Sequence, residues 1–250
     1  MKIVVLGGTG LIGRQVVALL EERGHEAVAA SPSTGVDAAT GAGLDEAFAG
    51  ADAVVDVTNP RDFAQEASIA YFEASTRHQL AAEKRAGVGH HVALSIVGVD
   101  RDPAARGYLA GKVVQERLIE EGGVPFTIVR ATQFFEFLAD IAEAGTVDGV
   151  VRITPSPMQP VAAAAVARTV ADAATAAPAG SVEIAGPERA PISDLVARVL
   201  VAAGDGREVV ADAGAGYFGR EVGELSLVPV GEAVIDPETL EEWLAATSTD

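Results

Sequence analysis

The feature that most constrains the fold of this chain is an alternation of short apolar runs with longer segments of helical periodicity. The alternation continues to residue 130, and a glycine closely follows each helical segment. Short apolar runs separated by helices are typical of parallel strands buried on both faces. The sequence therefore predicts an α/β fold with a doubly wound parallel sheet of the Rossmann type. The expected strands are 3–6, 27–30, 53–57, 92–95 and 126–130, and the expected helices are 11–23, 44–49, 63–85 and 105–121.

After about residue 150 the pattern becomes less regular. Prolines between 154 and 160 mark the expected boundary between a dinucleotide-binding domain, residues 1–154, and a smaller substrate-binding region, residues 155–250, partly packed on the first. We expect a substrate pocket in this region, because ligands of doubly wound proteins bind at the carboxyl ends of the strands. The expected elements here are helices at 161–177 and 193–203, a strand at 182–184, and a last helix that begins at Asp236-Pro237.

A glycine-rich turn lies between the first expected strand and the first expected helix. Gly7, Gly10 and Gly13 are spaced by three residues, a weak signal on its own. Its position is the stronger signal, because backbone N–H groups and the helix dipole at a helix start favour a pyrophosphate. A plain strand-to-helix turn is the alternative. The residues expected to bind the dinucleotide here are Gly7, Thr9, Gly10, Leu11, Ile12, Gly13 and Arg14.

The segment after the second expected strand bears on the choice of cofactor. A carboxylate in this position often binds the ribose hydroxyls of NAD, but this chain has Ser31, Ser33 and Thr34 instead. Their hydroxyls, together with Arg14, favour the 2′-phosphate of NADP, although NAD stays possible. The alternative is that these residues only shape a loop. Asp37, a little further on, is a candidate for contact with adenine.

Tyr108 and Lys112 form the most specific motif of the chain. They lie four residues apart on an expected helix, so both side chains share one face. With three tyrosines and three lysines in the chain, such a pair would arise by chance about 0.04 times. A nearby ammonium lowers the pKa of a phenol, so the pair suits proton transfer. Ser95, at the end of the fourth expected strand, can donate a hydrogen bond to a substrate oxygen that gains charge.

Taken together, these motifs resemble those of the atypical short-chain dehydrogenases/reductases, in the NmrA-like NAD(P)-binding family. The resemblance covers roughly residues 1–140 well. The segments that carry it are the turn Gly7-Gly8-Thr9-Gly10-Leu11-Ile12-Gly13, the run Val54-Val55-Asp56-Val57-Thr58-Asn59, Val92-Ala93-Leu94-Ser95, the Tyr108/Lys112 pair, and Phe126-Thr127-Ile128-Val129-Arg130-Ala131.

The resemblance implies roles for these residues. Tyr108 would be the general acid, Lys112 would tune it and bind ribose, and Ser95 would orient a carbonyl. Ala131 and Thr132 would lie near the nicotinamide. Members of the NmrA-like branch that bind the dinucleotide without turnover have usually lost the tyrosine, which this chain keeps. Many NADP-binding relatives place an arginine after the second strand, where this chain has serines.

Other residues have two possible roles. Thr58 and Asn59 follow a strand at the same edge as the glycine turn, so they either line the cofactor cleft or make a turn before Pro60. Three phenylalanines after the fifth strand either wall the substrate pocket or pack in the core. They are Phe134, Phe135 and Phe137.

Composition excludes several classes of function. The formal charge is −18, from 18 basic and 36 acidic residues, and no basic cluster is present, so we expect neither nucleic acid nor an anionic membrane as a partner. There is no cysteine, which excludes disulfides and thiolate ligands. His90 and His91 point to opposite faces of a strand and are expected to be a surface pair, so no metal site is predicted. No signal peptide or apolar span is found, which predicts a cytoplasmic protein.

The sequence predicts an NAD(P)H-dependent oxidoreductase. Hydride would pass between the nicotinamide and a small carbonyl or quinone-like substrate, and Tyr108 would give or take the proton. Two alternatives stay open. One is a regulatory protein that senses NADP without turnover, and the other is an NAD-dependent epimerase or dehydratase. No motif names the substrate or the oligomeric state.

Overall fold

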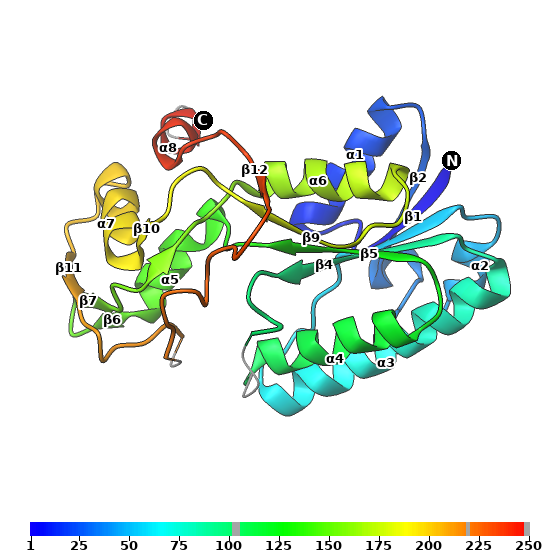
Figure 1. Cartoon of the computed structure of the whole chain (residues 1–250), viewed down its shortest axis with the longest axis horizontal. Helices are drawn as coiled ribbons and strands as arrows, with labels where there is room; N and C mark the ends of the chain where they lie inside the picture. Colours follow the sequence, from blue (N-terminus) through cyan, green and yellow to red (C-terminus); the bar gives the residue numbers. More distant parts are fainter. Residues whose placement is uncertain (102–105, 219–220, 248–250) are drawn as a thin grey trace. The chain divides into compact units, whose positions relative to one another are not determined.

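A computed structural model gives the fold of the chain and describes residues 1–101, 106–218 and 221–247. The chain divides into two compact units (Figure 1). The first consists of Met1–Arg130 with Ala164–Val182, and the second of Ala131–Ala163 with Glu183–Asp250. The domain boundary expected at residue 154 stays a prediction. None of the helices in the described ranges is both long and apolar enough to cross a bilayer.

The central sheet has seven strands in the order β12-β9-β5-β4-β3-β1-β2, so the predicted doubly wound parallel sheet is confirmed. Its strands are apolar because both faces are covered; the side chains of β1, for example, are buried from Ile3 to Leu6. The strand bounds are β1 (Lys2–Leu6), β2 (Glu26–Ala30), β3 (Ala53–Asp56), β4 (His90–Ile96), β5 (Phe126–Ala131), β9 (Gly180–Ala185) and β12 (Val234–Ile235).

In the first unit, helices cover both faces of the sheet. Figure 1 shows α1 (Leu11–Glu22) and α6 (Ala163–Thr175) over one face, and α3 (Gln65–Ala86) and α4 (Tyr108–Glu121) over the other. The short helix α2 (Leu44–Phe48) packs against α3 through Phe48 and Ala82. The 3-10 turn η1 (Pro32–Thr34) follows β2. Helix α4 begins at Tyr108, whereas residue 105, its expected start, lies outside the described residues.

Helices α3 and α4 approach each other closely because small residues lie between them. A Cβ on Gly111 of α4 would stand 2.7 Å from both the Cδ2 atom of Phe72 and the carbonyl oxygen of Ser68 on α3. Overlap of this kind forces neighbouring groups to move. Gly111 therefore sets the distance at which Tyr108 and Lys112 on α4 face the residues of α3.

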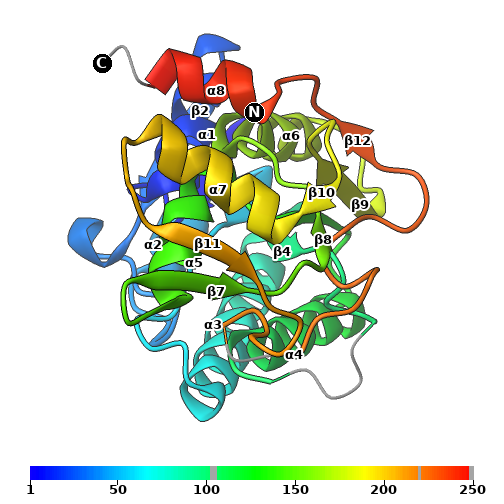
Figure 2. The same ribbon diagram turned by 90° about the vertical axis from the view of Figure 1, so that its left-hand side faces the viewer.

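Of the short elements in the second unit, the sequence pattern predicts the helix at 192–202 and, with an earlier start, the helix at 240–247, but not the others. Figure 2 shows α7 (Ile192–Ala202) beside β11 (Glu208–Ala211), and β11 beside β7 (Val150–Ile153). The two strands are parallel, although 54 residues lie between Ile153 and Glu208. Prolines and glycines interrupt the hydrophobic periodicity here, so pairing between distant segments defines the strands. The elements are η2 (Phe135–Phe137), α5 (Leu138–Ala144), β6 (Thr146–Val147), β7 (Val150–Ile153), β8 (Pro157–Met158), β10 (Ala190–Pro191), α7 (Ile192–Ala202), β11 (Glu208–Ala211) and α8 (Leu240–Thr247).

Candidate active site

The glycine turn between β1 and α1 requires glycine at specific positions. Gly7 has a φ of +77°, and a Cβ on it would stand 2.9 Å from the carbonyl oxygen of Val57. A Cβ on Gly13 would overlap the carbonyl oxygen of Gly7. The turn is closed by a hydrogen bond of 2.9 Å from the Gly10 N–H to the same oxygen. The turn is therefore pressed against both the end of β3 and the start of α1.

The start of α1 presents unpaired donors. Its N-cap is Gly10, which offers no side chain, and no side chain caps the first turn. The N–H groups of Leu11, Ile12 and Gly13 have no acceptor within the helix, because they lie in its first turn. Thr9 and Leu11 are exposed. These donors, with the dipole of α1 behind them, fit the pyrophosphate of a dinucleotide.

The hydroxyl groups after β2 are mostly used within their own loop. The Oγ atoms of Ser31 and Ser33 lie 2.7 Å apart. The hydroxyl of Thr34 donates to the Ser31 carbonyl and accepts from the Ser31 N–H, which caps η1. Arg14 is exposed and has no ion pair with any described residue. A guanidinium with no partner and an exposed Ser33 remain for a phosphate.

Asp37 and the end of β3 form the next part of the same edge. The Oδ1 atom of Asp37 accepts a hydrogen bond of 2.9 Å from the Ala39 N–H, which makes a local turn. Tyr71 of α3 hydrogen-bonds Thr58, and burial together with the charge of Asp56 raises its pKa to about 12. The charge of Asp37 also raises the pKa of Tyr71.

Tyr108 is placed at the carboxyl edge of β3 by its hydroxyl and by its ring. The hydroxyl donates a hydrogen bond of 2.5 Å to the Oδ1 atom of the exposed Asn59. The half-buried ring makes edge contacts with Phe63 and Phe72, with centroids 5.4 and 5.7 Å away. Asn59 is two residues beyond Val57, which touches Gly7. The phenol therefore stands at the edge where the glycine turn lies.

The residue before Tyr108 fixes where the helix begins. Gly107 is the N-cap of α4, with φ +60° and ψ −137°, a backbone conformation that is nearly restricted to glycine. Its N–H donates to the Oε1 atom of Gln65 at the start of α3, at 3.3 Å. The two helix starts are thereby joined next to the phenol.

Lys112 is buried, and its ammonium faces inward. The side chain is 3% exposed. The Nζ atom donates to the Leu94 carbonyl and to the Oε1 atom of Gln115, both at 2.8 Å, and lies 4.3 Å from the ring centroid of Phe72. Burial lowers the pKa of Lys112 to about 8. Tyr108 and Lys112 do share one face of α4, as their spacing predicts, and the Nζ atom lies 5.8 Å from the centroid of the phenol ring.

The pKa of Tyr108 differs from the expectation. The sequence predicts that Lys112 lowers it, but burial, the charge of Asp56 and the neighbouring Tyr71 raise the pKa of Tyr108. The lysine does not counter this because its ammonium points at Leu94 and Gln115 rather than at the hydroxyl. Tyr108 is therefore a protonated donor at neutral pH.

Ser95 lies on the same side of the sheet as the two helices. Side chains alternate along a strand, so Ser95, Ala93 and His91 of β4 share a face. His91 bonds to Glu83 of α3, and Ala93 packs on Ile119 of α4. Ser95 is 3% exposed, and its Oγ atom is buried without a hydrogen-bond partner in the described structure. An orphaned hydroxyl is a donor that a substrate or cofactor oxygen can satisfy.

The structure brings most of the predicted residues to one edge of the first unit. Gly7 meets Val57, Asn59 meets Tyr108, and Leu94, the residue before Ser95, accepts from Lys112. Ala131 ends β5, and Thr132 follows it in the second unit, where its N–H donates to the Ile184 carbonyl. The hydroxyl of Thr132 is buried and finds no partner among the described residues.

Three buried polar residues beneath the proposed site are not predicted from the sequence. Asp56 at the end of β3, Gln79 on α3 and Gln115 on α4 are each at most 1% exposed, and both amides donate to the Asp56 Oδ2 atom. A signal for Asp56 was present, since a carboxylate directly follows an apolar run. Gln115 lies three residues after Lys112, on the same helix face.

The predicted surface pair of histidines is wrong. His90 is 5% exposed and His91 is fully buried, because β4 lies between β3 and β5 in a sheet covered on both faces. His91 bonds to Glu83 at 2.7 Å, and the Nε2 atom of His90 lies 2.9 Å from the Thr127 hydroxyl. Within the described residues, no group of three or more His, Asp or Glu side chains is arranged to hold a metal ion.

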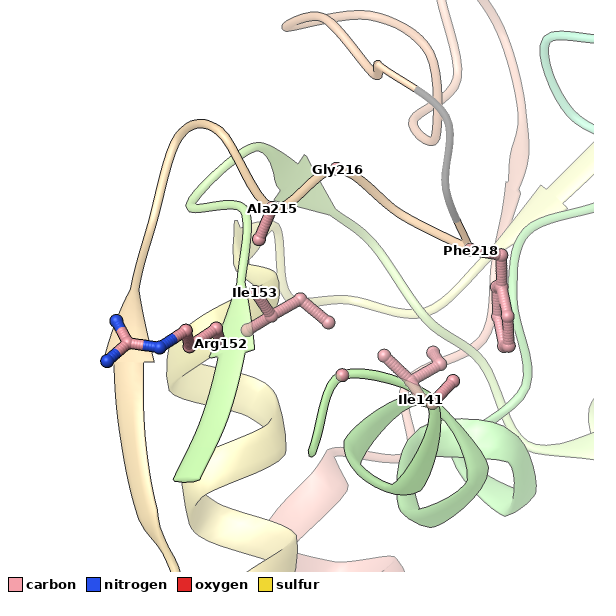
Figure 3. A pocket seen from close by; sticks show the side chains of 8 residues that line it. Ile141, Arg152, Ile153, Ala215, Gly216 and Phe218 are labelled. Carbon is pink, nitrogen blue, oxygen red and sulfur yellow. The ribbon is translucent and has the colours of Figure 1, made fainter. Parts of the chain in front are cut away.

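The second unit contains a small pocket of about 50 Å³. Ile141 of α5, Ile153 of β7 and Phe218 surround it, and the Arg152 guanidinium points away from these three residues (Figure 3). Phe218 lies in the region where a substrate pocket is expected. Of the three phenylalanines after β5, Phe135 is in the core against Trp243, and Phe137 is exposed and stacks on Phe134.

Comparison with known proteins identifies relatives. The model of a family described as NAD(P)H-binding matches residues 7–177. A (4-alkanoyl-5-oxo-2,5-dihydrofuran-3-yl)methyl phosphate reductase from Streptomyces griseus subsp. griseus is 32% identical over 163 residues, which are 60% of this chain and 54% of that protein. The chain thus matches about half the length of this curated relative.

Solved structures share the fold at low identity. A dTDP-4-dehydrorhamnose reductase from Bacillus anthracis, in complex with NADP, has a TM-score of 0.75 at 13% identity, over 97% of this chain and 96% of that one. A short-chain dehydrogenase/reductase superfamily protein from Agrobacterium tumefaciens, with bound NAD, has a TM-score of 0.73 at 18% identity, over 100% and 96%. Both bind a nicotinamide dinucleotide on the same architecture.

Proposed function

Because the chain belongs to the NAD(P)H-binding family whose model it matches, we propose that it is an atypical short-chain dehydrogenase/reductase that reduces a small carbonyl or quinone-like substrate with NADPH. The bound dinucleotide supplies hydride from C4 of its nicotinamide. In this proposal Tyr108 gives the proton, Lys112 holds ribose hydroxyls and supplies charge, and Ser95 donates a hydrogen bond to the substrate oxygen.

One observation carries the proposal. The hydroxyl of Tyr108 is held by Asn59 at the carboxyl end of β3, next to the turn that fits a pyrophosphate. A proton donor must be within hydrogen-bond reach of the reacting oxygen, and doubly wound proteins bind their cofactor at this edge. Asn59 is exposed, so the phenol can exchange this partner for a substrate oxygen without losing its ring contacts with Phe63 and Phe72.

The protonation state of Tyr108 supports reduction. Burial and Asp56 raise the pKa of the phenol, so it holds its proton until a substrate oxygen gains negative charge. In the opposite direction the residue would have to act as a phenolate, which the same surroundings disfavour. The matched relative from Streptomyces griseus is also a reductase.

The proposed residues for the cofactor follow from the donors available. The N–H groups at the start of α1 would bind the pyrophosphate, and Asp37 would lie near the adenine. The exposed, unpaired Arg14 and the hydroxyl of Ser33 would bind the 2′-phosphate of NADP. Thr58, Asn59, Ala131 and Thr132 would complete the site along the carboxyl ends of β3 and β5.

Tyr108→Phe tests the function most simply. The substitution keeps the ring packing and removes only the hydroxyl, so we expect an unchanged melting temperature and unchanged NADPH binding by fluorescence titration. Oxidation of NADPH with menadione, 9,10-phenanthrenequinone or 4-nitrobenzaldehyde should fall by about 100-fold or more, the size typical of a lost general acid. Full activity in the variant would refute the role of Tyr108.

A dinucleotide sensor is the second candidate. In that case the wild-type chain would bind NADPH but would not oxidise it in the presence of any of the three probe substrates. The retained Tyr108, with its hydroxyl at the cofactor edge, favours the reductase over the sensor.

A further inference from the structure

The ammonium of Lys112 is buried without a carboxylate beside it. Its hydrogen-bond partners are the Leu94 carbonyl and the amide oxygen of Gln115, and the described residues place no carboxylate within ion-pair distance. A buried charge without a counter-ion is strongly disfavoured. Something in the surroundings must therefore balance Lys112.

Gln115 connects this ammonium to a negative charge. Its Oε1 atom accepts from Lys112 at 2.8 Å, and its Nε2 atom donates to the Oδ2 atom of Asp56 at 2.9 Å. An ammonium can only donate and a carboxylate can only accept, so these partners fix the amide in one orientation. The amide dipole then points its oxygen at the cation and its N–H at the anion.

The carboxyl group of Asp56 is surrounded by hydrogen-bond donors. It is 1% exposed and accepts four hydrogen bonds, from the N–H and the hydroxyl of Thr58 at Oδ1 and from Gln79 and Gln115 at Oδ2. A carboxylate can only accept, so each of these four donors is satisfied by it. Asp56 therefore provides a fixed negative charge one amide away from Lys112.

We propose that Gln115 is a positioning residue that couples the carboxylate of Asp56 to Lys112, and so keeps the lysine charged and fixes its ammonium in place. This inference rests on the proposed function, in which Lys112 acts beside Tyr108. In this arrangement Asp56 is the counter-ion of the lysine, although the two groups never touch.

The titratable groups around Lys112 and Asp56 come from four elements. Asp56 on β3 and Glu116 on α4 act on Lys112, and Asp56 also acts on Tyr71 of α3, His91 of β4 and Tyr108 of α4. Asp56 and Glu116 raise the pKa of Lys112 against the effect of burial, which leaves it at about 8. Asp56 also raises the pKa of His91 and of Tyr108. Loss of the bridge to Asp56 should therefore lower the pKa of Lys112 further.

The chain offers a matched control in Gln79. Both glutamines are fully buried, and both donate to the same oxygen of Asp56, at 3.0 Å from Gln79 and 2.9 Å from Gln115. Only Gln115 also touches Lys112. If the hydrogen bonds to Asp56 only stabilise the fold, the two glutamines should be equivalent. If Gln115 couples Asp56 to Lys112, only the loss of Gln115 should change the pKa of Lys112.

The test measures the protonation of Lys112 directly, in the chain without cofactor. With [13Cε]lysine, NMR observes only three lysines, Lys2, Lys84 and Lys112, and Lys112→Met assigns the third signal. The pH midpoint of the Lys112 signal is compared in wild type, Gln115→Met and Gln79→Met. Fold is checked for each variant by its melting temperature and by the signals of Lys2 and Lys84.

We expect Gln115→Met to lower the midpoint of Lys112 by about one pH unit, and Gln79→Met to change it by less than about a third of that. Equal changes in both variants, or no change in Gln115→Met, would overturn the proposal. If Gln115→Met does not fold, Asp56→Asn replaces it, with the same expected direction, and an unchanged midpoint would again overturn it.

Activity gives a second, separate result. With NADPH and 9,10-phenanthrenequinone as substrates, kcat of Gln115→Met should no longer reach a pH-independent plateau, and its kcat should fall by a larger factor than its KM rises. Gln79→Met should show neither change. Because the NMR titration needs no cofactor or turnover, an active Tyr108→Phe would end the proposed function and leave this coupling standing.

Discussion

At the scale of single residues, the cost of burying Lys112 is the dominant feature of the site. Its pKa falls from 10.5 to about 8, which means that the folded chain holds this proton less tightly than the unfolded chain does. Leu94, Gln115 and Phe72 all contact the buried ammonium of Lys112. An apolar residue would pack there at less cost, so we infer that the lysine is present for function.

The pH dependence of stability should reveal this cost. Between pH 8 and pH 10.5 the unfolded chain keeps the lysine proton and the folded chain releases it, so stability contributed by this group rises with pH in that window. We expect the free energy of unfolding of wild type, relative to Lys112→Met, to increase by about 2 to 3 kcal/mol from pH 8 to pH 10.5. Urea unfolding of both chains measures it, and a flat difference would contradict the burial of the charge.

Arg14 should decide the choice between the two dinucleotides. Arg14→Ala removes the unpaired guanidinium in the first turn of α1, so NADP affinity should fall by about 10-fold while NAD affinity stays the same. Arg23→Ala, at the other end of the same helix and paired with Asp172, is the control and should change neither. Isothermal titration with each nucleotide measures the effect. Tighter binding of NAD than of NADP by wild type would refute the preference.

At the scale of elements, the start of α4 controls the position of Tyr108. The sequence predicts the helix, but not where it begins, because Gly107 ends the preceding loop in a conformation that no hydrophobic pattern records. The end of the helix was easier to predict, since the glycines at 122 and 123 follow it directly. Strands β1 to β5 were predicted to within two residues at either end, because their apolar runs are buried on both faces.

Two glycines at the ends of α4 allow a matched test. Gly107 and Gly123 both have positive φ, +60° and +72°, but only Gly107 adjoins the phenol. Gly107→Ala and Gly123→Ala should each destabilise the fold by about 1 to 2 kcal/mol. Only Gly107→Ala should also lower kcat, by about 10-fold or more, because it displaces the Tyr108 hydroxyl. Equal kcat values for the two variants would show that the helix start does not position the phenol.

At the scale of the whole molecule, the sequence predicts the two units unequally. In the first unit, the hydrophobic pattern predicts the sheet. The glycine turn and the Tyr108/Lys112 pair predict the edge of the sheet where the proposed site lies. The sequence could not reveal the links among Asp56, Gln79 and Gln115, which come from three different elements and meet only in the fold. In the second, β7 and β11 pair across a long separation in a segment rich in glycine, so local periodicity gives no signal.

The most direct test of the account is a crystal structure of the chain with NADP⁺ bound. The account predicts the pyrophosphate at the start of α1 and the Tyr108 hydroxyl within about 4 Å of the substrate side of the nicotinamide C4 atom, a reacting distance. A nicotinamide bound more than about 8 Å from that hydroxyl, or a Tyr108 side chain turned to bulk water, would contradict it.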